Sequence, residues 1–454
     1  MLTSISPIDG RYEEKVKVLS PYFSEYGLQK YRIQIEIEYF IALCEIGIKP
    51  LSKLSSQEKI LLRDIYKKFS VKDGEKIKQI EKITNHDVKA IEYFIKEKLA
   101  KTSLKKYLEF IHFGLTSQDI NNTATPLLIT DGMRNEVLPK IQKVIKMLSN
   151  LSYTWKDIPL LARTHGQPAS PTTLGKEIAV FVSRLKKQYK KLDSFILSAK
   201  FSGATGNFNA HLVAYPKYNW YFFGKNFVEK ILGLEYCEIS TQIDSYDSLS
   251  EWCQILVRIN TILIDLNRDI WQYISHEVFE LKIISGEIGS SAMPHKVNPI
   301  DFENSEGNLG ISTAVLQHFV EKLPISRLQR DLTDSTVLRN IGVPISHTYI
   351  ALESLLKGLS KLEVRKDVLY TELENHWNVV AEAIQTILRR EGYEKPYEAL
   401  KKLTRGKEGL DKKTLHMFID TLKIGDEIKK ELKKITPHNY IGMASKLVDI
   451  VNKG

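Results

Sequence analysis

The sequence predicts an all-α protein with a central bundle of unusually long helices. Apolar residues recur at steps of three and four over stretches as long as 174–196 and 249–274, which is the pattern of a helix with a buried face. Alternating apolar and polar residues flanked by hairpin turns are scarce. A small domain does not need helices of this length, so we expect the bundle to pack against copies of itself as a homo-oligomer.

The N-terminal part contains shorter predicted helices. Residues 1–28 have no clear pattern and are expected to be irregular. Residues 29–48 are ambiguous, because their isoleucines alternate as in a strand and also fit one helical face. The apolar pattern is longer than a typical strand, so we predict a helix. Further helices are predicted over 52–69 and 88–99, where the apolar spacing is helical.

The long helices are predicted from residue 117 onward. Their apolar stripes cover 133–151, 174–196, 249–274, 311–321 and 343–362. The stripe of 174–196 is similar to that of a coiled coil. Residues 249–274 are apolar on more than one face, as expected of a helix surrounded by several others.

Three domains are expected from these patterns. Residues 1–115 would form an N-terminal helical domain and 116–362 the long-helix bundle, which we expect to be the oligomer core. Charge rises near 361–367, and residues 363–454 would form a small C-terminal domain of short, Lys-rich helices.

Composition indicates an ordinary globular protein. The chain has 454 residues, of which 43% are hydrophobic and 26% charged, with a formal net charge of +10, enough for two or three domains. A basic surface could bind nucleic acid or attract a small anionic substrate, or the lysines could simply solvate helix faces. The three cysteines share no metal spacing, and no signal peptide or membrane span is indicated, so we expect a cytoplasmic protein.

The most informative stretch is 286–307, which reads GEIGSSAMPHKVNPIDFENSEG. Its glycines and prolines predict one long loop, and loops of this length are usually functional or disordered. Disorder is the competing interpretation, but Met293 and Phe302 are too apolar for a solvated tail. The stretch also contains hydroxyl, amide and ammonium groups, which suit a lid that binds an anion.

Four other segments combine polar residues in a way that packing does not require. Residues 163–169 read RTHGQPA, between two long helices, and place a histidine where it could titrate near neutral pH. Residues 84–87, TNHD, and 112–119, HFGLTSQD, could bind an anion at a helix N-terminus or merely cap helices. Residues 326–339 carry three arginines with interleaved hydroxyls, which suits a phosphate or a solvated basic helix face.

The sequence lacks the motifs of several common kinds of enzyme chemistry. The dinucleotide-binding, P-loop, zinc-protease and paired-cysteine patterns are missing, so nicotinamide, ATP hydrolysis and zinc have no support. Acid–base chemistry on an anionic substrate remains.

The same segments carry a family resemblance. GSSAMPHKVNP at 289–299 resembles the shared loop of the fumarase–aspartase superfamily of all-α lyases, which release fumarate by β-elimination. His295 in that loop and Gly166 in the THGQPA run are similar to the adenylosuccinate lyase family, and the segments at 6–12, 84–87 and 335–339 to its bacterial branch.

The resemblance implies a three-domain helical protomer in a homotetramer, with each active site built from three subunits and no cofactor or metal. It implies release of fumarate from adenylosuccinate, giving AMP, and from succinyl-aminoimidazole-carboxamide ribotide in purine synthesis. Argininosuccinate lyase, or another fumarate-releasing lyase of the superfamily, is the alternative enzyme. Outside the enzymes, an inert structural relative and a basic nucleic-acid binder are the alternatives.

The resemblance also implies roles for individual residues. His165 would be the catalytic acid and Ser290 the catalytic base. The residues implied to contact the substrate are Arg11, Tyr12, Asn85, His86, Asp87, Thr116, Ser117, Gln242, Ser291, Lys296, Asn298, Asn304, Arg330, Ser335, Thr336 and Arg339.

Overall fold

The computed structural model describes residues 2–283, 293, 296–404 and 410–453. It confirms the all-α prediction, because helices dominate this part of the chain and its strands form only four two-stranded sheets. The chain divides into two compact units. Unit 1 comprises Met1–Ile141, Gln188–Thr261 and Gly307–Ala351, and unit 2 comprises Gln142–Lys187, Ile262–Glu306 and Leu352–Gly454.

The N-terminal helices of unit 1 surround the buried helix α3, Glu25–Glu45, which confirms the choice of helix over strand. Most of α3 is buried on several sides, which explains its ambiguous pattern. The other helices here are α4 (Ser56–Lys67), α5 (Val71–Thr84), α6 (Asp87–Leu99) and the 3₁₀ helix η2 (Ser103–Phe110).

The expectation that residues 1–28 are irregular is wrong in part. They contain α1 (Glu13–Val16), η1 (Lys17–Leu19), α2 (Ser20–Phe23) and the first turn of α3. Elements of three or four residues are too short to show a periodic stripe, so local signals define them. Pro21 lies in the first turn of α2, and the Ser24 side chain caps α3 by accepting from the Gly27 N–H.

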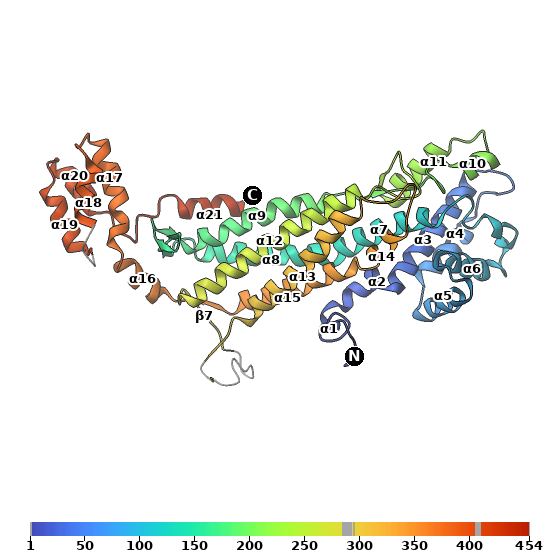
Figure 1. The fold of residues 1–454 in the computed structure, drawn as a ribbon, viewed down its shortest axis with the longest axis horizontal. Helices are drawn as coiled ribbons and strands as arrows, with labels where there is room; N and C mark the ends of the chain where they lie inside the picture. Colours follow the sequence, from blue (N-terminus) through green and yellow to red (C-terminus); the bar gives the residue numbers. More distant parts are fainter. Residues whose placement is uncertain (1, 284–292, 294–295, 405–409, 454) are drawn as a thin grey trace. The chain divides into compact units, whose positions relative to one another are not determined.

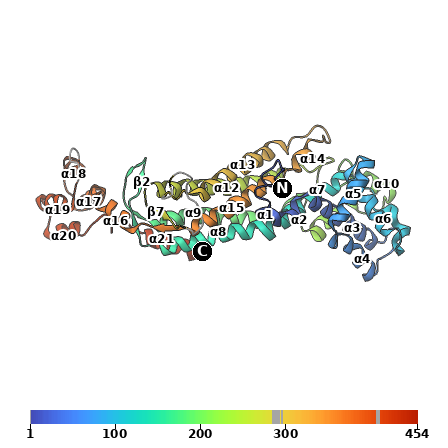
Figure 2. The ribbon, with the colours of Figure 1, turned by 90° about the horizontal axis from the view of Figure 1, so that it is seen from below.

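Five long helices, drawn in Figures 1 and 2, confirm the predicted bundle. Each of them contributes residues to both units. Buried polar bonds join neighbouring helices within each unit. In unit 1 the Asn260 side chain donates to Ser312 Oγ, and in unit 2 that of Asn267 donates to Ser305 Oγ, both at 3.0 Å. The helices are α8 (Leu138–Thr154), α9 (Leu174–Asp193), α12 (Asp247–Ser275), α13 (Ile300–Lys322) and α15 (Gly342–Ser360).

The predicted loop over 286–307 is too long at its C-terminal end. Helix α13 begins at Ile300, so residues 300–307 are helical. Pro299 ends the loop because its carbonyl accepts from the N–H groups of Phe302 and Glu303, and a proline before a first helical turn loses no helical hydrogen bond. Phe302 is buried, so the apolar residue that argued against disorder belongs to the helix.

The remaining elements connect the long helices. In unit 1 they are α7 (Ser117–Gly132), the π turn η3 (Met133–Val137), β5 (Ser198–Ala199), α10 (Asn209–Ala214), α11 (Trp220–Asn226), η4 (Phe227–Leu232), β6 (Glu235–Tyr236) and α14 (Thr333–Leu338). Unit 2 contains three antiparallel pairs: β1 (Pro159–Leu160) with β4 (Thr172–Thr173), β2 (Arg163–Thr164) with β3 (Gln167–Pro168), and β7 (Phe279–Leu281) with β8 (Leu362–Val364).

The C-terminal helices of unit 2 share an apolar core formed by residues such as Trp377, Ile384 and Leu415. They are α16 (Lys366–Glu374), η5 (Trp377–Val380), α17 (Ala381–Arg390), α18 (Pro396–Thr404), α19 (Lys412–Thr421) and α20 (Asp426–Lys433). The last helix, α21 (Ala444–Lys453), lies instead against β4 and the segment after α8, where Ser445 Oγ donates to the Lys156 carbonyl. Across the described ranges, no helix combines the length and the apolarity needed to cross a bilayer.

Candidate active site

Unit 1 brings together polar segments that are far apart in the sequence. The start of α6, the start of α7, the loop before α12 and helix α14 are linked by side-chain hydrogen bonds and ion pairs. They supply most of the substrate-contacting residues that the resemblance implies.

His86 lies at the N-cap of α6, facing the start of α7. Its Nδ1 accepts from the Lys89 N–H at 3.1 Å, so the proton of the neutral ring is on Nε2. Nε2 lies 3.5 Å from Ser117 Oγ and can donate toward it or toward a bound anion. Asn85 before it adopts a left-handed backbone (φ +52°) that ends α5 and allows the sharp turn between α5 and α6. The cap and the binding interpretations of this segment are therefore compatible.

Asp87 is held by two arginines. Its Oδ2 lies 2.9 Å from Nη2 of Arg32 and 3.1 Å from Nη2 of Arg339. Burial alone would raise the pKa of Asp87, but the charges of Arg32 and Arg339 and the Val88 N–H together hold that pKa below its usual value. Asp87 is thus an anion that fixes two guanidinium groups.

Arg330 occupies the centre of a second cluster. Its Nη2 donates to Ser335 Oγ at 2.8 Å, and its Nη1 lies 3.5 Å from Gln242 Oε1. Gln118 Nε2 donates to the same serine hydroxyl at 3.3 Å; with its amide reversed, the Gln118 oxygen would instead accept from Arg330. The cluster places a half-buried guanidinium beside a hydroxyl, which are both groups that can donate to a phosphate.

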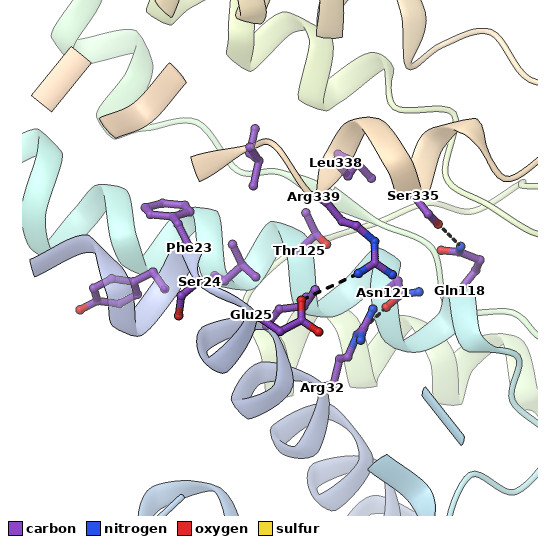
Figure 3. Close-up of a pocket in the computed structure, with 14 residues that line it drawn as sticks. Phe23, Ser24, Glu25, Arg32, Gln118, Asn121, Thr125, Ser335, Leu338 and Arg339 are labelled. Carbon is purple, nitrogen blue, oxygen red and sulfur yellow. Dashed lines mark hydrogen bonds and ion pairs between the residues drawn. The ribbon is translucent and has the colours of Figure 1, made fainter. Parts of the chain in front are cut away.

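A pocket opens between these clusters, with an empty volume of about 690 Å³ (Figure 3). In Figure 3 the Arg32 and Arg339 side chains lie close together, with Asn121 beside Arg32 and Gln118 pointing toward Ser335. Apolar residues of α2, α3, α7 and α14 line the rest of the wall. Glu25 also lines the pocket, with Oε2 3.8 Å from Nη1 of Arg339. One side of the pocket therefore carries charged groups of both signs, and the other side is apolar.

His165 belongs to unit 2 and lies at the tip of a hairpin. Strands β2 and β3 are joined by His165 and Gly166, whose φ angles are +53° and +74°. Positive φ at both central residues is typical of a type I′ turn, which Gly166 favours. Arg163 anchors the hairpin, because its guanidinium donates to the Gly166 carbonyl and forms an ion pair with Glu372 of α16. The imidazole is exposed on a well-supported turn.

The other predicted residues are not all joined to these clusters. Lys296 is exposed and Asn298 half-buried just before α13, and Asn304 lies on α13 and accepts from Ser354 Oγ at 2.7 Å; all three are in unit 2. Arg11 and Tyr12 precede α1, and Thr336 is exposed on α14. Ser290 and Ser291 lie outside the described residues.

Arg32 is a site residue that sequence reasoning missed. It is buried on α3, where its Nε donates to Asn121 Oδ1 at 2.9 Å in addition to its ion pair with Asp87. The signal was an arginine next to the isoleucines of the predicted helix, because a charge that becomes buried requires a partner. The partner is distant in sequence, so the pattern alone could not name it.

A second buried group supports the segment before α7. His211 is fully buried, and a Cβ added at Gly114 would lie 2.7 Å from its ring, so only glycine fits there. Its Nε2 lies 2.9 Å from the Tyr39 hydroxyl, which donates to the Phe113 carbonyl. Burial lowers the pKa of His211 to about 4; by smaller amounts, the charge of Asp119 raises this pKa and that of Lys200 lowers it.

This histidine should make the fold sensitive to acid. The unfolded chain takes up a proton below pH about 6.5, whereas the folded protein does so only near pH 4. Its contribution to stability is therefore complete above pH 6.5 and is lost as the pH falls, by about 3 kcal/mol at pH 4. We expect the melting temperature to fall less between pH 7 and pH 5 in His211→Phe than in wild type. Equal falls in the two proteins would contradict this.

Comparisons with known proteins identify the family. The family described as "Lyase" matches residues 10–315, and the one described as "Adenylosuccinate lyase C-terminal" matches residues 326–441. The chain is 55% identical over 453 residues to an adenylosuccinate lyase of Dictyostelium discoideum, covering 97% of each chain. It is 51% identical over 450 residues to that of Escherichia coli K12, covering 99% of this chain and 98% of the relative.

Solved structures agree on the fold. The fumarate lyase of Mesorhizobium sp. BNC1 superposes with a TM-score of 0.74 at 22% identity, covering 97% of this chain and 98% of the other. The 3-carboxy-cis,cis-muconate lactonizing enzyme of Pseudomonas putida gives 0.75 at 19% identity, covering 96% of each. The near-complete match to curated relatives and to the specific C-terminal region shows that the chain belongs to the adenylosuccinate lyase family.

Proposed function

We propose that the protein splits adenylosuccinate into AMP and fumarate, and succinyl-aminoimidazole-carboxamide ribotide into its carboxamide and fumarate. These would be carbon–nitrogen lyase steps in the synthesis of AMP and of IMP. The observation that carries the proposal is the cluster of unit 1, where the start of α7 lies beside His86 and the Arg330–Ser335 pair. It offers donors for both a carboxylate and a phosphate.

The nucleotide phosphate would bind at the arginine side of this cluster. Arg330, Ser335 and Arg339 supply guanidinium and hydroxyl donors, and Arg11 and Tyr12 would complete the site. Binding energy gained at the phosphate is remote from the reacting carbon, so it can be used to fix the succinyl group in a reactive geometry.

The succinyl carboxylates would bind at the start of α7. A C–H bond next to a carboxylate loses its proton to give a dianion, which prearranged donors must stabilise. Thr116 and Ser117 at the helix N-terminus, the Nε2–H of His86 and the Gln242 amide are donors of this kind. Lys296 and Asn298 would add an ammonium and an amide, with Ser291 and Asn304 nearby and Asn85, Asp87 and Thr336 as further contacts.

Two proton transfers complete the elimination. Ser290 would remove the proton from carbon, with its alkoxide stabilised by the ammonium of Lys296. His165 would protonate the departing nitrogen. His86 and Asp87 would tune His165 when the site is assembled.

We further propose a cytoplasmic homotetramer of three-domain subunits, with domains 1–115, 116–362 and 363–454 and each site built from three subunits. Long helices able to pack against other copies and the exposed hairpin of His165 support this. A residue on an exposed turn can enter the site of a neighbouring subunit.

Fumarate release from the purified protein tests the proposed reaction. We expect adenylosuccinate to yield AMP and fumarate in equal amounts, followed by ultraviolet absorbance and by product analysis. Argininosuccinate serves as the matched control substrate and should give none. Fumarate from argininosuccinate alone would establish the alternative lyase, and salt-sensitive binding of random duplex DNA without turnover would favour a nucleic-acid binder.

A further inference from the structure

Lys200 and Asp119 form a buried ion pair that the proposed reaction does not use directly. Both side chains are 0% exposed, and Lys200 Nζ lies 2.6 Å from Asp119 Oδ1. Two charges taken out of water gain little net stability even when they are well paired. Stability alone therefore does not explain why this ion pair is buried here.

Asp119 connects two backbone segments. Its Oδ2 accepts from the Thr116 N–H at 2.8 Å, which closes the capping box at the start of α7. Its Oδ1 accepts from the Ser202 and Gly203 N–H groups at 2.9 and 3.1 Å, in addition to Lys200. One carboxylate therefore fixes the helix end that presents Thr116 and Ser117 against the loop of residues 200–206.

The loop of residues 200–206 holds the opposite side of the site. Ser202 Oγ lies 3.0 Å from Ser240 Oγ, and the Ala204 carbonyl accepts from Gln242 Nε2 at 3.0 Å. A Cβ at Gly206 would lie 2.2 Å from the Ser240 carbonyl oxygen, so the approach is as close as glycine allows. Gln242 in turn neighbours Arg330.

We propose that the Lys200–Asp119 pair is a positioning device that sets the separation between the carboxylate-binding end of α7 and Arg330, on the side that binds the nucleotide. The inference rests on the proposed function. It makes Lys200 and Asp119 positioning residues, because neither touches the reacting atoms. It also explains why the charges are buried, since a network with several fixed donors specifies one geometry.

The double variant Lys200→Met/Asp119→Asn tests this inference, because it removes both charges and leaves no unpaired ion. A ligand that spans both halves senses their separation, whereas AMP and fumarate each bind one half. We expect kcat/KM for adenylosuccinate to fall on the order of 10- to 100-fold, mainly through KM, while the inhibition constants of AMP and fumarate change about threefold or less. Equal losses for substrate and both products, or a kcat/KM within about twofold of wild type, would overturn the inference.

Two further variants keep the test decisive if the double variant does not fold. Ser240→Ala removes only the Ser202–Ser240 bond at the half-buried end of the loop. It should raise KM by about three- to tenfold at an unchanged melting temperature, and an unchanged KM would overturn the inference. Arg63→Met is the matched control, because it breaks the Arg63–Glu38 ion pair between α3 and α4 of the same unit. It should lower the melting temperature and leave KM unchanged, and a comparable rise in KM there would also overturn the inference.

Wild-type turnover reports on the proposed function by itself. The inference is judged only on ratios of each variant to wild type. If the wild-type protein releases no fumarate, the proposed reaction is wrong. The geometry is then judged by hydrogen exchange, where the double variant should expose the N–H groups of Thr116, Ser202 and Gly203 more than wild type. Unchanged protection there would overturn the positioning role independently of activity.

Discussion

Replacing His165 with alanine is expected to lower kcat on the order of 10²- to 10⁴-fold, the range that a general acid contributes. The departing nitrogen is a poor leaving group as an anion, so its protonation is required in the transition state. The exposed turn that carries His165 tolerates alanine at its surface, and the Arg163–Glu372 anchor of the hairpin is left in place. Stability should therefore change little.

The measurement compares fumarate release and substrate affinity in His165→Ala with those in His276→Ala. His276 is an exposed histidine of the same unit, at the end of α12, and serves as the matched control. We expect the control to keep wild-type kcat and His165→Ala to keep near wild-type binding of adenylosuccinate. A His165→Ala enzyme with kcat within about tenfold of wild type would remove His165 from the acid role.

The helices could be predicted where one period governs a long stretch. The ranges of α9, α12 and α15 follow from apolar steps of three and four, because such stripes are the buried faces themselves. The start of α13 was misplaced because the glycine at 307 and the proline at 299 were both read as loop signals. A helix can begin directly after a proline and tolerate an interior glycine when Phe302 and other side chains are buried.

The site was predicted in pieces, and its assembly was not. Each polar segment can be recognised locally, because a capping threonine, a turn histidine and a group of arginines with interleaved hydroxyls all have local signatures. The ion pair of Arg32 with Asp87 joins positions 55 residues apart, and that of Lys200 with Asp119 joins positions 81 apart. A single sequence shows that a charge is present, but only the fold shows which opposite charge it meets.

Replacing Ser290 with alanine should abolish turnover while leaving substrate binding nearly intact. The resemblance makes Ser290 the base, acting as its alkoxide, and loss of a general base costs on the order of 10²- to 10⁴-fold in kcat. The substrate would still be held by the phosphate and carboxylate donors of unit 1, which do not involve residue 290. A titration of Ser290→Ala with adenylosuccinate should therefore give a dissociation constant within about threefold of the KM of wild type.

Mixing the two inactive variants tests whether Ser290 and His165 of one site come from different subunits. If they do, random reassembly of Ser290→Ala and His165→Ala subunits at equal amounts leaves both residues intact in about one site in four. Activity should then recover to about a quarter of the wild-type value after the tetramers are dissociated and reassembled together. Each variant reassembled alone is the control and should stay inactive. Mixed tetramers that form without recovery would place both residues in the same subunit's site, because a site built within one chain always inherits one of the two defects.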